Sequence, residues 1–210
     1  MFNFYRKIVN YMKIKNKGIN NTVNIAESVY LRKKSKIKIS GNYNSLLIED
    51  GTYNNLEIRI EGDDNSVKIL SSEGINNLKI IVQNNSNHVH LDRNLHIAQC
   101  LIVSCGKSNY ITIGEGCMLS TNIEIWGCDG HSILEDNKII NLSKSISIGK
   151  NVWIGGNVKI LKGVNIPEGC VVGANSLITS KLFLPNSIIV GSPAKTIKEN
   201  IRWSRENLEF

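Results

Sequence analysis

The chain has 210 residues, which is enough for one well-buried core without a second domain. Its formal charge of +7 is uneven, because residues 1–38 carry ten Lys or Arg and one acid while the remainder is close to neutral. A nearly neutral body argues against a nucleic-acid binder that uses a broad basic face. No apolar run approaches the roughly 18 residues of a membrane span, and Arg6, Lys7 and Lys13 interrupt any secretory signal.

The cysteines are odd in number and contain no CxxC pair, so we expect reduced thiols in a cytoplasmic protein. They are Cys100, Cys105, Cys117, Cys128 and Cys170. Asn is abundant, with 28 residues, which suits a fold with many tight corners because Asn tolerates positive φ.

Residues 1–36 are predicted to form a basic N-terminal arm. Residues 2–14 mix large apolar side chains with basic ones, which favours a short helix that caps a repeat stack or contacts another subunit. A helix lying on a membrane surface is the alternative. We expect the arm to bind an anionic polymer, or to give at most peripheral association with the inner face of a membrane.

A loose repeat begins near residue 37. Turn-like clusters recur at intervals of 10 to 12 residues, beginning at Gly41, Gly51, Gly62 and Gly74, and short alternating strands follow most of them. A repeat this self-similar predicts stacked coils rather than a sandwich.

The period tightens to six residues from Ile113 onwards. The repeated apolar positions are Ile113, Leu119, Ile125, Ile148, Ile154, Ile160, Ile166, Val172 and Ile178. Three residues after seven of these stand Gly116, Asn122, Asn151, Asn157, Gly163, Gly169 and Asn175. Gly and Asn accept the left-handed backbone that a corner requires. The pattern predicts an all-β hexapeptide solenoid over residues 37–200, followed by a tail at 201–210 with a short helix.

The hexapeptide count breaks between Ile125 and Ile148, where the spacing of 23 is not a multiple of six. The inserted loop, residues 127–146, contains His131, and loops on a regular scaffold commonly carry function. His131 is therefore a candidate catalytic residue, with an ordinary loop histidine as the alternative. His88 and His90 alternate on one strand face but have no third ligand nearby, so we predict no metal site.

Four motifs in the second half of the chain resemble those of the hexapeptide-repeat O-acetyltransferases, including enzymes that act on sugars and on polysialic acid capsules. The resemblance covers residues 113–203. The motifs are Asp129-Gly130-His131-Ser132-Ile133, Asn151-Val152-Trp153-Ile154-Gly155, Gly173-Ala174-Asn175-Ser176 and Gly191-Ser192-Pro193-Ala194-Lys195.

The resemblance implies a left-handed β-helix that assembles as a homotrimer with active sites between subunits. It implies acetyl-CoA as the acyl donor and two catalytic residues, His131 as the base and Trp153 beside the acetyl group and the pantetheine arm. The implied cofactor-binding residues are Trp153, Gly155, Gly156, Ala174, Thr179, Lys195 and Lys198, the two lysines meeting the coenzyme's phosphates.

These roles agree with the chemistry of acetyl transfer to a carbohydrate hydroxyl. An imidazole can take the proton from a hydroxyl near neutral pH, and a backbone amide near residues 153–156 could stabilise the oxyanion. Asp129 is a candidate for orienting His131. Three alternatives stay open: Cys128 as a covalent nucleophile, N-acetylation of an amino sugar, and a non-catalytic glycan-binding solenoid.

Overall fold

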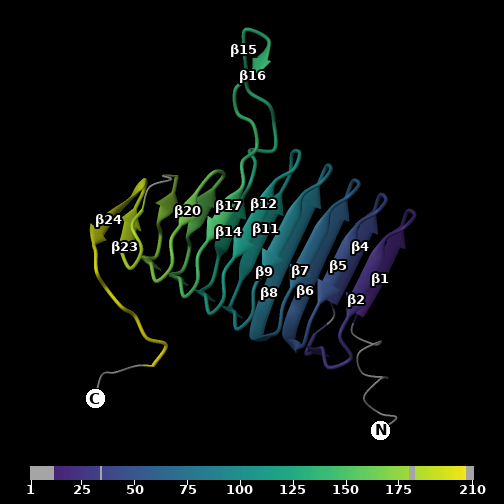
Figure 1. Ribbon diagram of the computed structural model, residues 1–210, viewed down its shortest axis with the longest axis horizontal. Helices are drawn as coiled ribbons and strands as arrows, with labels where there is room; N and C mark the ends of the chain where they lie inside the picture. Colours follow the sequence, from purple (N-terminus) through teal and green to yellow (C-terminus); the bar gives the residue numbers. More distant parts are fainter. Residues whose placement is uncertain (1–11, 34, 180–182, 207–210) are drawn as a thin grey trace.

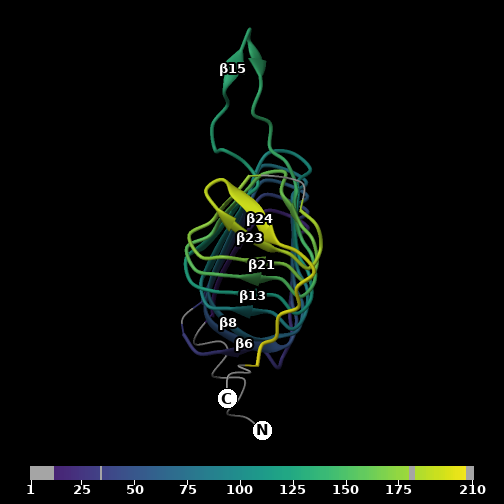
Figure 2. The same ribbon diagram turned by 90° about the vertical axis from the view of Figure 1, so that its left-hand side faces the viewer.

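The computed structural model describes residues 12–33, 35–179 and 183–206, and every regular element within them is a β-strand. The strands form coils that stack along one long axis, and a single hairpin projects from the stack (Figure 1). Viewed along that axis, the coils superimpose around a common interior (Figure 2). No helix in the described ranges is long and apolar enough to cross a membrane.

Three columns of parallel strands run along the stack. The first column is β1 (Met12–Lys17), β4 (Ser35–Ser40), β6 (Gly51–Glu61), β8 (Ser72–Gln83), β11 (Cys100–Ser104), β14 (Ile123–Trp126), β19 (Lys159–Leu161) and β22 (Leu177–Ile178). The second column is β2 (Thr22–Ile25), β5 (Ser45–Ile48), β7 (Ser66–Ile69), β9 (His88–Leu91), β12 (Tyr110–Ile113), β17 (Ile146–Ile148) and β20 (Asn165–Ile166).

The third column shares its long strands with the first, because β6 and β8 run through both. Its other strands are β3 (Tyr30–Leu31), β10 (His96–Ile97), β13 (Met118–Leu119), β18 (Trp153–Ile154), β21 (Val171–Val172) and β23 (Ile188–Gly191), closed by the antiparallel β24 (Ala194–Lys198).

Inward-facing side chains stack in rows that follow the strand register. One row in the first column consists of Ile37, Ile58, Ile80, Ile102, Ile125, Ile160 and Ile178, each at most 1% exposed. Burial of each such side chain contributes roughly 1.5–3 kcal/mol relative to exposure. Alternation with polar outward residues explains why the short strands bury their apolar positions so completely.

The corners of the hexapeptide region have the backbone that the sequence predicts. All seven Gly and Asn positions have positive φ, between 50° and 79°. Gly155 shows a second requirement, because a Cβ atom there would lie 2.7 Å from the backbone nitrogen of Ala174 in the next coil. The corner prediction is confirmed.

Asparagine also serves a second purpose in the longer-period region. Asn44, Asn65, Asn87 and Asn109 are buried, and the side-chain oxygen of each of the first three accepts a hydrogen bond from the backbone N–H of the next, at 2.9–3.1 Å. This internal ladder satisfies polar groups that would otherwise be buried without partners.

The two ends of the chain differ from the sequence prediction. Residues 12–17 form strand β1 rather than a helix, because Met12 and Ile14 alternate with lysines at a period of two. The solenoid therefore starts at residue 12 instead of 37, since β1, β2 and β3 pair with the following coil. Residues 201–206 contain no helix, and the rest of both predicted helices lies outside the described residues.

Candidate active site

The inserted loop leaves the first column after β14 and returns to the second column at β17. Its outer part is the hairpin of β15 (Leu134–Glu135) and β16 (Lys138–Ile139). Asp136 and Asn137 form the turn with φ of 49° and 61°, as a tight two-residue hairpin turn requires. The hairpin stands clear of the solenoid body (Figure 1).

A hydrogen-bond network fixes the root of this loop. The side-chain nitrogen of Asn141 donates to the carboxylate of Asp129 and to the backbone oxygen of His131, both at 2.8 Å. The side-chain oxygen of Asn141 accepts from the backbone N–H of Ile133 at 2.6 Å. Lys162, on the coil that follows the loop, donates to the Asp129 carboxylate and, at 2.7 Å, to the backbone oxygen of Asn141.

The network determines the charge of Asp129. The hydrogen bond from Lys162 holds the pKa of the Asp129 carboxyl below its usual range, against the opposing effect of partial burial. The carboxylate is thus charged at neutral pH and paired with Lys162. Asp129 orients the backbone of His131 through Asn141, and its carboxylate bonds to Lys162 and Asn141 rather than to the imidazole.

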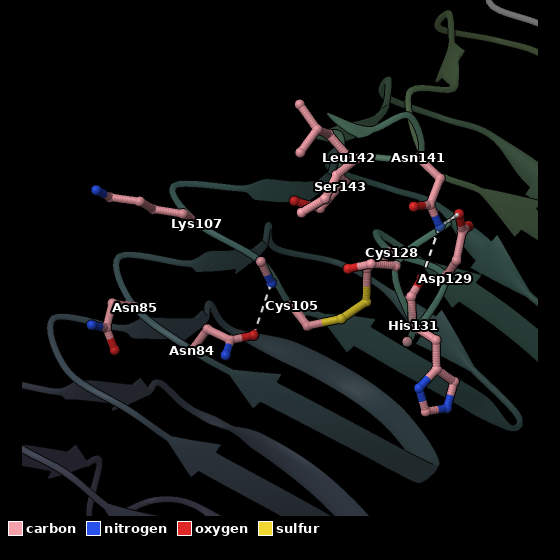
Figure 3. A pocket seen from close by; sticks show the side chains of 14 residues that line it. Asn84, Asn85, Cys105, Lys107, Cys128, Asp129, His131, Asn141, Leu142 and Ser143 are labelled. Carbon is pink, nitrogen blue, oxygen red and sulfur yellow. Dashed lines mark hydrogen bonds between the residues drawn. A yellow bond between two sulfur atoms is a disulfide. The ribbon is translucent and has the colours of Figure 1, made fainter. Parts of the chain in front are cut away.

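His131 lies exposed at the edge of a pocket of 760 Å³ beside the loop root (Figure 3). The lining residues are Asn84, Asn85, Cys105, Gly106, Lys107, Cys128, Asp129, Gly130, His131, Ser132, Ile139, Asn141, Leu142 and Ser143. The pocket floor therefore comes from the corners of two preceding coils, and its wall comes from the loop. Such a floor of amide and amine groups suits a hydroxyl-rich ligand.

Cys105 and Cys128 form a disulfide in this pocket wall, so the prediction of five reduced thiols is wrong for this pair (Figure 3). They are 23 residues apart, which is also the distance in sequence between paired residues of β11 and β14. Two cysteines separated by the length of one coil were therefore the signal in the sequence for this disulfide. In the disulfide Cys128 has no free thiol to act as a nucleophile.

The other three cysteines, Cys100, Cys117 and Cys170, are free and buried. Burial raises the pKa of Cys117 to about 12.

Trp153 lies on a different face of the solenoid, in the third column. Register places Met118, Trp153, Val171, Ile188 and Lys198 in one row across β13, β18, β21, β23 and β24. Trp153 is 42% exposed, so it is not simply core packing. Its indole lies 6.0 Å from that of Trp203, which donates to the backbone oxygen of Asn151 at 2.7 Å.

The other predicted cofactor residues lie around this row. Gly155, Gly156 and Ala174 occupy neighbouring corners, linked by the hydrogen bond from Asn175 N–H to the Gly156 oxygen at 2.9 Å. Lys195 and Lys198 are exposed on β24. Thr179 follows β22 in the first column. A partly exposed apolar row that ends at a lysine fits a ligand with a long apolar arm and terminal phosphates.

One chain does not bring the two sets of candidate residues together. His131 stands where the first column turns into the second, whereas Trp153 and the apolar row belong to the third column. None of Trp153, Gly155, Gly156, Ala174, Thr179, Lys195 or Lys198 lines the His131 pocket. Among the described residues, no group of three potential ligands could hold a metal ion.

Sequence reasoning missed Lys162 and Asn141, which position the loop. Asn141 is one of several polar residues of the inserted loop, and neither residue belongs to one of the four motifs. Lys162 stands immediately before the corner Gly163, where a basic residue carries no distinctive signal. Only the three-dimensional course of the loop brings it to Asp129.

Comparison with known proteins identifies this architecture. The family described as bacterial transferase hexapeptide (six repeats) matches residues 145–180. A polysialic acid O-acetyltransferase of Neisseria meningitidis is 35% identical over 197 residues, covering 90% of this chain and 88% of the relative.

Two crystal structures are similar over nearly the whole chain. The polysialic-acid-specific acetyltransferase NeuO has a TM-score of 0.80 at 30% identity, covering 95% of this chain and 92% of its own. The polysialic acid O-acetyltransferase OatWY has a TM-score of 0.83 at 32% identity, covering 93% and 92%.

The fold and the loop thus define an acyltransferase built on a parallel left-handed β-helix. The chain belongs to the hexapeptide-repeat O-acetyltransferase family and is an enzyme that transfers an acetyl group to a carbohydrate. The resemblance seen in the four motifs is confirmed.

Proposed function

We propose that this enzyme transfers an acetyl group from acetyl-CoA to a hydroxyl of an acidic surface polysaccharide or its precursor, with His131 as general base. The observation that carries the proposal is an exposed imidazole at the edge of a pocket beside the loop root, where Asn141 bonds the His131 backbone oxygen. The names of the similar enzymes, which act on polysialic acid, support an acidic polymer as the acceptor.

The reaction is a direct transfer in a ternary complex. The imidazole of His131 accepts the proton of the acceptor hydroxyl as its oxygen attacks the thioester carbonyl. The carbon–sulfur bond then breaks, and the coenzyme's sulfur leaves with the proton that the imidazolium returns. The products are the acetyl ester and free coenzyme A.

The oxyanion of the intermediate needs a positioned N–H donor. The backbone N–H groups of Trp153 and Gly155 already donate to Cys170 and Val172, at 2.9 and 2.8 Å. Among the described residues the N–H of Gly156, which lies outside the strands, has no carbonyl partner. Gly156 is therefore the donor that we assign to the oxyanion.

The row of side chains in the third column fits acetyl-CoA, the acyl donor. Trp153 and its apolar neighbours would border the acetyl group and the pantetheine arm, while Lys195 and Lys198 would meet the phosphates. Gly155 must lack a side chain because the next coil approaches it closely, and Ala174 and Thr179 add only small groups along the coil corners.

A second copy of the chain completes the site in this proposal. His131 and Trp153 lie on different columns, so the donor row facing one His131 would belong to a neighbouring subunit. A homotrimer with cyclic symmetry would repeat this contact three times and close it. In this arrangement one subunit alone has no complete active site, so catalysis would require the trimer.

A basic patch on the outer face of the first column supports an acidic acceptor. Register sets Lys13 beside Lys36 and Lys15 beside Lys38, although like charges directly opposite each other are unfavourable. These side chains, Arg59 and one acid, Glu57, line a groove of 460 Å³. Lys38 and Arg59 also pair with Glu61, which leaves an excess of positive charge. An anionic polymer would relieve the repulsion, so we assign this patch to polymer binding or to peripheral membrane association.

A cytoplasmic location at the inner face of the membrane is also part of the proposal. The Cys105–Cys128 bond provides its test, because cytosolic thiols are normally kept reduced. If the enzyme is cytoplasmic, the bond would form only on exposure to an oxidising environment, and alkylation of thiols in intact cells, followed by mass spectrometry, should find both cysteines modified. An intact bond would place the protein in an oxidising compartment instead.

The transfer itself is tested by thiol release from acetyl-CoA, with polysialic acid and a neutral glycan as acceptors and His131→Ala beside the wild type. We expect release only with the acidic glycan and only in the wild type. A product labile to mild alkali would be an ester, whereas a stable product would indicate N-acetylation. The family relationship speaks against the non-catalytic solenoid.

A further inference from the structure

Tyr110 is an exposed aromatic side chain on a face whose other outward side chains are mostly polar. It begins β12 in the second column and is 52% exposed. The outward neighbours in this column include Lys68, His90, Thr112 and Ser147. The ring belongs to no hydrophobic cluster of the described residues, so core packing does not explain it.

The ring of Tyr110 is held in place by the two preceding coils. Register aligns Ser66, His88 and Tyr110 in one row. The His88 and Tyr110 rings stack with centroids 4.6 Å apart and planes 23° apart, and Ser66 Oγ lies 2.7 Å from His88 Nδ1. Such a preformed platform loses little conformational entropy when a ligand binds.

The platform adjoins the His131 pocket through two stretches of chain. Tyr110 follows the pocket-lining Lys107 by three residues, and its backbone N–H donates to Ser145 Oγ at 3.0 Å. Ser145 is two residues from Ser143, which lines the pocket and packs directly on Gly106. A ligand longer than one sugar unit could therefore reach from the pocket to Tyr110.

The chemistry of the platform fits a sugar ring. The C–H groups on one face of a pyranose carry partial positive charge and pack on the negative face of an aromatic ring. Ser66 and Thr112 offer hydroxyl groups beside the platform. Lys68 and Lys107 make the surroundings basic, which favours a sugar that carries a carboxylate.

We propose that Tyr110, backed by His88, is a second sugar subsite that holds the unit of an acidic glycan next to the one being acetylated. This subsite rests on the proposed function for its acceptor, and it adds a preference for chains over single sugars. The enzyme would acetylate polymer units because two neighbouring units are held at once.

The test compares Tyr110→Ala with the wild type on sialic acid monomer and on sialic acid oligomers of increasing length. Loss of one aromatic contact should raise the KM for oligomers about three- to tenfold, while kcat and the KM for the monomer stay within about twofold. Tyr110→Phe should behave like the wild type. Tyr30→Ala, which removes an exposed tyrosine from the third column, is the matched control and should change nothing.

Direct binding of the oligomers without acetyl-CoA separates this inference from the proposed function. Affinity that depends on Tyr110, in an enzyme that transfers no acetyl group, would support the subsite and overturn the proposed function. Equal affinity of Tyr110→Ala and wild type, or no binding by either, would overturn the subsite. A changed oligomeric state in Tyr110→Ala would identify the platform as a contact between copies. An increased KM for acetyl-CoA alone would assign it to the donor's adenine; either result overturns the proposal.

Discussion

Lys162 donates a hydrogen bond to the carboxylate of Asp129, so the coil after the insertion holds the first residues of the loop that carries His131. The Lys162 side chain is only 17% exposed. The same nitrogen also bonds the backbone oxygen of Asn141 on the loop's return arm. One lysine thus ties both arms of the loop to the rigid solenoid.

Replacing Lys162 with Met should loosen the loop root without unfolding the solenoid. We expect kcat to fall about tenfold or more, because small displacements of a catalytic group are costly, while the melting temperature changes little. The control is Lys159→Met, which removes an exposed ion pair with Glu124 and should leave kcat unchanged. Equal kcat for Lys162→Met and wild type would contradict the positioning role.

Low pH should break the contact between Lys162 and Asp129. Because the folded-state pKa of Asp129 is lowered, its contribution is present at neutral pH and is lost as pH falls through that lowered value. Protection of the loop from proteolysis should therefore still be present at about pH 4, near the ordinary pKa of an aspartate, and should be lost only at lower pH. Asp129→Asn should lack this acid transition; a transition of the wild-type loop above pH 5 would argue against the assignment.

The Cys105–Cys128 bond should contribute to stability but not to chemistry. Closing a loop of 23 residues stabilises the fold by about 3 kcal/mol. The double variant Cys105→Ser, Cys128→Ser should unfold at lower denaturant concentration, as should the wild type in reductant, while transfer activity persists. Complete loss of activity in a folded Cys128→Ser enzyme would instead revive the covalent mechanism.

Removal of one asparagine from the buried ladder should lower the free energy of unfolding. Asn87 is fully buried, and its amide bonds the backbone of Gln83, Gly106 and Asn109. Asn87→Ala leaves these partners unsatisfied and should cost about 1–3 kcal/mol in unfolding free energy. Asn165→Ala, on the exposed side of β20, is the control. Equal denaturation midpoints for the two variants would show that the ladder adds nothing.

The basic patch should act through charge. Lys15→Glu with Lys38→Glu, on exposed strand positions, should raise the KM for polysialic acid severalfold while the KM for a neutral acceptor stays constant. Added salt should reduce the difference between variant and wild type, because exposed charges are screened. A salt-independent difference would contradict an electrostatic role.

The solenoid was predictable because its signals are local and repeated. A Gly or Asn every six residues marks a corner that must have positive φ, and each predicted corner has it. The N-terminal strand was not recognised, because six residues that alternate Lys with Met and Ile contain too few periods to separate a strand from a basic helix. The register that pairs Met12 with Ser35 resolves the choice.

The site was predictable only in part, for a different reason. The break in the hexapeptide count located the loop and His131. However, Asp129 pairs with Lys162, which lies 33 residues later in the sequence. Nor could motif order show that His131 and Trp153 lie on different columns. Contacts that depend on how an irregular loop folds back leave no periodic trace in the sequence.

The most direct test of the account is complementation between two inactive variants, His131→Ala and Trp153→Ala. Unfolded and refolded together in equal amounts, they should form a statistical mixture of trimers. One of the three sites in each mixed trimer, and about one quarter of all sites, would combine an intact His131 with an intact Trp153 from the neighbouring copy. We predict that transfer activity returns to about that fraction of wild type, with each variant inactive alone. Mixed trimers that form but stay inactive would contradict a site shared between copies.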